Sequence, residues 1–229
     1  MDEMIDTPSP NFDARTLPIS MVVLHSTGMI DGASAITRLA DPEAKVSAHY
    51  VVAEDGQIIR MVDEANRAWH AGKSWWRGIS DVNSASVGIE IVNPGHEFGY
   101  RPFPQVQIES VIRLVAGVVS RYGITRGNVV GHSDVAPARK DDPGELFPWH
   151  QLAKLRLALP RPTKNLMDPH WSDAGFLLAL ERFGYDVTDG PAAVRAFQRR
   201  FRPELMDGII DGECRAILLA LLLPKPMGD

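Results

Sequence analysis

Residues 85–92 read ASVGIEIV, and this stretch decides the fold. Apolar residues alternate along it with small or polar ones, a period that is typical of a β-strand. We therefore expect a central strand of a sheet here. Glu90 lies within this strand. A lone carboxylate in a strand commonly faces solvent on a half-exposed sheet, and the alternative is that Glu90 has a functional role.

Two segments that precede this strand are also typical of a sheet. Residues 19–24 form a short, β-branched apolar run that ends at His25, which predicts a buried strand with the histidine at its end. Residues 48–53 and 57–62 are separated by a Glu-Asp-Gly turn and predict a β-hairpin.

Three segments have the composition and spacing of helices. Residues 31–39 predict a short helix with Asp31 as its N-cap. Residues 105–122 place their apolar side chains on one helical stripe, which ends at Gly123, and residues 149–159 predict a further helix. Strands and helices together predict an α/β fold with a mixed central β-sheet flanked by helices.

Two stretches show neither the helical nor the strand periodicity, and we expect them to be loops. Residues 66–84 carry three of the five tryptophans. A short strand at residues 128–130 runs into His132, and the chain from there to Gly144 has no helical or strand pattern. This second stretch has the character of a long functional loop.

A Pro-Arg-Pro sequence at 160–162 predicts a domain boundary. We expect one domain at residues 1–159, whose first 17 residues are an extension, then a linker at 160–170. Residues 171–223 contain three short helical stripes and predict a small three-helix domain with a core of its own, separable from the first domain.

Composition excludes several classes of protein. The 229 residues are 45% hydrophobic and carry a net charge of −5, which argues against a nucleic-acid partner held mainly by electrostatics. Cys214 is the only cysteine, so neither an intrachain disulfide nor a cysteine zinc knuckle is possible. The longest apolar run has eight residues, too few for a transmembrane segment. The acidic N-terminus predicts a cytoplasmic protein, with the periplasm or cell envelope as the alternative if a leader was removed.

Zinc hydrolases use three protein ligands, drawn from histidine and carboxylate, and leave the fourth position for water. His25 at a strand end, His132 after a strand and Asp142 in the following loop meet this requirement. Their spacing alone does not prove that they converge, and a histidine at a strand end is more often a capped or partly exposed residue.

A family resemblance adds to this pattern. Residues 131–144 (GHSDVAPARKDDPG) resemble the signature loop of the zinc-dependent N-acetylmuramoyl-L-alanine amidases, a family shared with peptidoglycan recognition proteins and a phage lysozyme. Four further blocks agree in order and content: VLHST at 23–27, VSAHYVV at 46–52, AWHAG at 68–72 and VGIEIVN at 87–93.

The resemblance implies a role for each matched residue. It makes His25, His132 and Asp142 the ligands of Zn²⁺, Glu90 the residue that moves a proton from water to the leaving amine, and Lys140 the stabiliser of the oxyanion. The implied reaction is hydrolysis of the amide between N-acetylmuramic acid, or its anhydro form, and L-alanine of peptidoglycan stem peptides. Such a reaction belongs to cell-wall turnover or the recycling of muropeptides.

Other residues of the matching blocks have less definite roles. His49, His70 and Trp69 are candidates for substrate binding, although a packed core is an equal explanation for both histidines. Asp134 and Asp141 are interpreted as turn residues whose side chains bond their own backbone.

The C-terminal unit is similar to the peptidoglycan-binding domain that often follows such amidases. AAVRAFQ at 192–198 and DGIIDG at 207–212 carry this similarity, while Cys214 stands where threonine is common. Two alternatives to the amidase remain: a non-catalytic receptor for peptidoglycan or muropeptides, and a zinc hydrolase that acts on a different amide.

Overall fold

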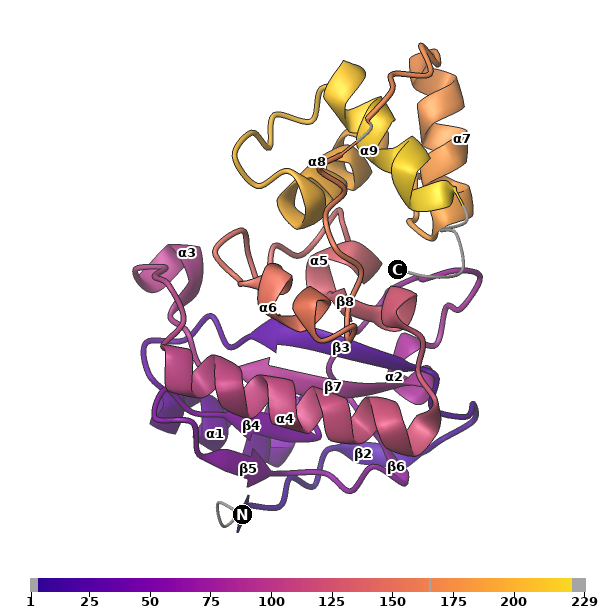
Figure 1. Cartoon of the computed structure of the whole chain (residues 1–229). Coiled ribbons are helices and arrows are strands. Elements are labelled where there is room, and N and C mark those ends of the chain that lie inside the picture. The colour runs from indigo at the N-terminus through magenta and orange to yellow at the C-terminus, as the bar shows by residue number, and fades with distance from the viewer. Residues whose placement is uncertain (1–3, 165, 224–229) are drawn as a thin grey trace.

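The central sheet of the protein has six strands, with helices against its faces and a helical unit beyond one edge (Figure 1). The computed structural model describes residues 4–164 and 166–223, so the first three residues of the acidic N-terminus lie outside it. Every neighbouring pair of strands is parallel except β4 and β5, which form the predicted hairpin. The strands in spatial order are β1 (Ile5–Asp6), β5 (Ile58–Arg60), β4 (Tyr50–Val52), β7 (Ser86–Ile91), β3 (Met21–Ser26) and β8 (Val129–Gly131).

The alternation of the central strand determines which side chains face which layer. Val87, Ile89 and Ile91 of β7 pack into the apolar layer under α4 (Gln105–Tyr122), which crosses one face of the sheet in Figure 1. Successive strand side chains point to opposite faces, so Glu90 faces away from α4. His25 is paired in register with Glu90 and shares that second face.

The helices predicted at residues 31–39 and 105–122 are confirmed. Helix α1 (Gly32–Ala40) begins after Asp31, whose side chain accepts a hydrogen bond from the Ser34 N–H. Helix α4 has the predicted bounds and ends at Gly123, whose φ of 62° is the left-handed conformation that favours glycine. Leu39 of α1 packs with Val51 of β4, on the face opposite α4.

Several short elements differ from the sequence-based expectation. The N-terminal extension supplies β1 and β2 (Phe12–Ala14), and β2 pairs with β6 (Asn66–Ala68) inside the expected tryptophan loop. Elements of two to four residues have no measurable period and form through tertiary contacts. The remaining short elements are α2 (Val82–Ala85), α3 (Gly95–Phe98), α5 (His132–Val135), α6 (Trp149–Lys154) and two 3₁₀ turns, Pro42–Ala44 and Arg126–Asn128. Two of these correct the expectation directly: α5 begins the expected functional loop, and α6 ends at Lys154 rather than at residue 159.

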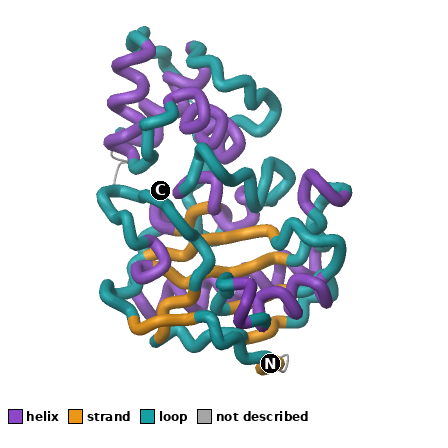
Figure 2. Tube along the Cα trace, turned by 180° about the vertical axis from the view of Figure 1, so that it is seen from behind, coloured by secondary structure: helices purple, strands orange, loops and turns teal. Residues whose placement is uncertain are grey.

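The C-terminal unit has the three predicted helices, α7 (Asp173–Phe183), α8 (Gly190–Phe201) and α9 (Gly212–Leu222). They lie together beyond the β8 edge in both views (Figures 1 and 2). The expectation of a separate core is wrong, because one apolar cluster joins side chains of these helices to Trp76, Val130 and other residues of the first 159. The boundaries of the domains remain a prediction.

No helix within the described residues is both long and apolar enough to cross a membrane.

We predict that Gly117→Ala stabilises the protein by roughly 0.5–1 kcal/mol, because glycine costs conformational entropy inside a helix. A Cβ at this α4 position would meet only the mobile end of Arg121, at 3.2 Å. Gly123→Ala is the matched control and should destabilise, since its backbone is left-handed. Urea denaturation measures both changes, and a loss of stability in Gly117→Ala would contradict the predicted packing of α4.

Candidate metal centre and catalytic pocket

Three side chains converge where β3 and β8 end. His25 lies near the end of β3, His132 follows β8 directly as the first residue of α5, and Asp142 reaches back from the loop beyond. The two strands are parallel neighbours, so their carboxyl ends meet at the same edge of the sheet. The His25 Nδ1 lies 2.9 Å from His132 Nδ1 and 3.2 Å from Asp142 Oδ2, and His132 Nδ1 lies 3.1 Å from the same oxygen.

The loop that carries two of these residues is closed by its own backbone. The Ser133 N–H donates to the Asp142 carbonyl at 2.9 Å, which ties the start of α5 to the third residue of the group. A Cβ on Gly131 would lie 2.8 Å from Pro143, so this close approach requires glycine. Backbone contacts thus fix the distance between His132 and Asp142.

A chain of hydrogen bonds determines the tautomer of His25. The Ser86 hydroxyl donates to the Val82 carbonyl at 2.5 Å, so its oxygen accepts from His70 Nε2–H at 3.2 Å. His70 Nδ1 is then an acceptor, and His25 Nε2–H donates a hydrogen bond to it at 3.0 Å. His25 Nδ1 therefore carries a free lone pair, and burial lowers the pKa of His25 to about 4, which keeps the ring neutral.

A single contact determines the tautomer of His132. Its Nε2 lies 3.1 Å from the Ala71 carbonyl and must donate there, which leaves Nδ1 without a proton. Two ring nitrogens and one carboxylate oxygen thus face one another as acceptors. Tetrahedral zinc with bonds of about 2.0–2.2 Å would hold its ligand atoms about 3.3 Å apart, close to the spacing here. The donor set fits a small divalent cation of this kind.

The side chains of Glu90 and Lys140 line a pocket beside this group. The pocket has a volume of about 430 Å³, and both side chains line it together with His132 and Asp142. Glu90 Oε2 is buried and has no hydrogen-bond partner among the described residues. Burial, reinforced by the charge of Asp142, raises the pKa of Glu90 to about 8. A buried carboxylate with an unused oxygen in a cleft is a candidate for proton transfer.

The structure separates the three candidates for substrate binding. Trp69 and His70 line the pocket, and the indole N–H of Trp69 donates to Asp13 of β2 at 2.7 Å. His49 is fully buried and accepts the Gly88 N–H at 2.9 Å, so it links β4 to β7 instead of facing substrate. This placement corrects the expectation that His49 could line the cleft.

Sequence reasoning missed the residues that support His70. Ser86 holds one side of the ring, and a Cβ on Gly88 would lie 2.4 Å from it. The signal was the strand alternation itself, because Ser86, Gly88 and Glu90 occupy every second position of β7. A small residue between two polar ones on that face leaves room for an imidazole.

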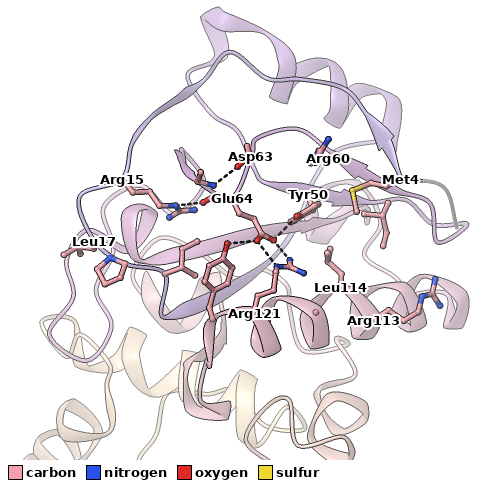
Figure 3. Close-up of a pocket in the computed structure, with 16 residues that line it drawn as sticks. Met4, Arg15, Leu17, Tyr50, Arg60, Asp63, Glu64, Arg113, Leu114 and Arg121 are labelled. Carbon is pink, nitrogen blue, oxygen red and sulfur yellow. Dashed lines mark hydrogen bonds and ion pairs between the residues drawn. The ribbon is translucent and has the colours of Figure 1, made fainter. Parts of the chain in front are cut away.

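A second hollow, of about 810 Å³, lies between α4 and the β4–β5 hairpin (Figure 3). Glu64 stands at its centre and accepts hydrogen bonds from Tyr50, Arg121 and Tyr122. None of the three convergent acceptors lines this hollow. The carboxylate is already satisfied by the protein, so the pocket at the strand ends is the better catalytic candidate.

Comparison with known proteins finds relatives of this chain. The family model described as N-acetylmuramoyl-L-alanine amidase matches residues 15–145. The N-acetylmuramoyl-L-alanine amidase AmiD of Escherichia coli is 37% identical over 230 residues, which cover 89% of this chain and 82% of AmiD. The 1,6-anhydro-N-acetylmuramyl-L-alanine amidase AmpD of the same organism is 31% identical over 176 residues, covering 68% of this chain and 92% of AmpD.

Two solved structures are similar over nearly the whole chain. AmiD from E. coli, in complex with its substrate anhydro-N-acetylmuramic acid-L-Ala-D-γ-Glu-L-Lys, has a TM-score of 0.80 and 36% identity and covers 92% of this chain and 91% of its own. AmpDh3 from Pseudomonas aeruginosa has a TM-score of 0.81 and 32% identity, with 94% of each chain covered.

We predict that Gly88→Ala destabilises the protein by about 1–3 kcal/mol, the usual cost of overfilling a packed interior. The added methyl group would collide with the His70 ring, which is itself held between His25 and Ser86. Thermal unfolding measures the loss, and Gly117→Ala is the comparison, because there the added methyl group meets only the end of the Arg121 side chain. Unchanged stability in Gly88→Ala would show that the ring does not rest against this strand.

Proposed function

The chain belongs to the N-acetylmuramoyl-L-alanine amidase family, and from that premise we propose how its residues carry out the reaction. The enzyme hydrolyses the amide bond between N-acetylmuramic acid and L-alanine of peptidoglycan stem peptides, in cell-wall turnover or recycling. Its substrate is peptidoglycan or a muropeptide derived from it.

The proposed cofactor is one zinc ion held by His25, His132 and Asp142. The support is that two buried ring nitrogens and a partly buried carboxylate oxygen lie within 3.2 Å of one another. When bound there, zinc would activate a water molecule and polarise the amide carbonyl. His70 and the Ala71 carbonyl orient the rings of His25 and His132 by accepting hydrogen bonds from their Nε2–H groups.

Glu90 is the proposed proton carrier, and the observation that carries this proposal is its buried Oε2, which has no partner among residues 4–164 and 166–223. In the ionised form of Glu90, that oxygen can accept a proton from water and return it to the leaving amine of L-alanine. Lys140 lines the same pocket, and we assign its ammonium group to the negative charge that develops on the carbonyl oxygen.

A non-catalytic receptor is the competing function from another class. A receptor needs a shaped pocket and no proton carrier, so Glu90 would then be an ordinary strand carboxylate. Glu90 lines the same pocket as His132 and Asp142, where a carboxylate can exchange a proton with a water molecule, and this position favours the enzyme. Binding of wall glycan by the C-terminal unit and a cytoplasmic location remain predictions from the sequence.

We predict about one equivalent of zinc per chain in purified protein, lost in His132→Ala, because removing one of three ligands abolishes tight binding. The matched control is His170→Ala, a histidine whose side chain is 86% exposed. Elemental analysis after dialysis measures both. Full zinc content in His132→Ala would overturn the proposed ligand set.

We predict that Glu90→Gln lowers turnover by at least ~100-fold while zinc content and folding are kept, since the amide preserves shape and cannot carry the proton. The soluble substrate is anhydro-N-acetylmuramic acid-L-Ala-D-γ-Glu-L-Lys, and Glu181→Gln, at an exposed position of α7, is the control. Turnover within a few-fold of the parent would make Glu90 a structural residue. A parent protein that binds zinc and muropeptide without cleaving would support the receptor.

A further inference from the structure

A buried carboxylate outside the proposed mechanism links the metal-ligand loop to the C-terminal unit. Asp134 lies in α5, two positions after His132, and is 1% exposed. Its Oδ2 accepts the Gly131 N–H at 2.7 Å, which fixes the backbone just before His132. Its Oδ1 accepts the hydroxyl of Tyr185, a fully buried residue between α7 and α8, at 2.5 Å.

The other end of the loop is held from the same unit. Asp141 directly precedes Asp142, and its carboxylate pairs with Arg199 of α8 at 2.7 Å. The next residue of α8, Arg200, lies over the Trp149 ring with its guanidinium carbon 3.4 Å from the ring centroid. Side chains of the C-terminal unit therefore contact the loop next to each of the two ligands it carries.

We propose that the C-terminal unit positions the metal ligands, with Tyr185 acting on His132 through Asp134 and Arg199 acting on Asp142 through Asp141. This inference rests on the proposed function, because it concerns the geometry of the same zinc site. A ligand whose backbone is fixed before the metal arrives loses less freedom on binding, so groups that hold it raise metal affinity. The unit thus serves catalysis whether or not it also binds the wall.

The test substitutes Tyr185 and Arg199 in the full-length protein and compares each variant with a matched control. Tyr185→Phe removes one hydroxyl and keeps the ring in the apolar core. Its matched control is Tyr50→Phe, which also removes a buried phenol that donates to a carboxylate, here Glu64 at 2.8 Å in the distant hollow of Figure 3. Arg199→Gln is paired with Arg60→Gln, which breaks the exposed ion pair with Asp6.

Zinc affinity, measured by competition with a chromophoric chelator, is the decisive readout. We expect a loss of about 10-fold in Tyr185→Phe, at the low end for residues that support metal ligands, and a smaller loss in the same direction in Arg199→Gln. The visible absorption of the Co²⁺-substituted protein should shift in both variants. Neither control should change affinity or spectrum, although Tyr50→Phe should lower the thermal unfolding temperature.

The outcomes separate this inference from the proposed function. Affinity and Co²⁺ spectrum equal to the parent in Tyr185→Phe, with only a lower unfolding temperature, would overturn the positioning role. If Tyr185→Phe does not fold, Arg199→Gln decides in the same way, because an ion pair with an exposed partner contributes little to stability. A parent protein without zinc would overturn the proposed function and this inference together, whereas zinc in the parent with unaffected variants would overturn the inference alone.

Discussion

The parallel pairing of β3 with β7 on one side and β8 on the other is the constraint on which the site depends. This register sets His25 opposite Glu90 and sets Leu24 opposite Gly131, the residue before His132. A shift of β3 by one residue would turn His25 toward α4 and remove it from the group. The apolar residues that hold β3 and β7 against α4 therefore also determine the geometry of the chemistry on the opposite face.

Acceptor atoms gather at the candidate metal centre and at Glu90 beside it. The ring protons of His25 and His132 are committed to His70 and to the Ala71 carbonyl, so the atoms that face the pocket are lone pairs. Glu90 adds an oxygen that no group in the described part of the chain satisfies. In a buried site such a cluster of acceptors is costly unless positive charge and protons arrive from outside. Lys140 contributes part of that charge, and a divalent cation with its substrate water would contribute the rest.

Sequence reasoning succeeded where a pattern persists over many residues. The central strand at 85–92 and the helix at 105–122 were predictable because their periods repeat several times and end at residues with a physical reason to end them. The role of His25, His132 and Asp142 as one ligand set followed from the family resemblance of the segments at 23–27 and 131–144, since their spacing alone left it open.

What the sequence could not show depends on contacts between distant segments. Asp134 was interpreted as a turn residue, and its bond to the Gly131 N–H is of that local kind. Its second partner, Tyr185, lies 51 positions away, so the sequence around Asp134 contains no signal for this contact.

The apolar cluster shared by both parts of the chain also makes their folding cooperative, because loss of the C-terminal helices would expose Trp76 and Val130 to water. Replacing this unit by a helical unit from another protein would therefore require a matched apolar surface, which limits how freely the two parts can be recombined.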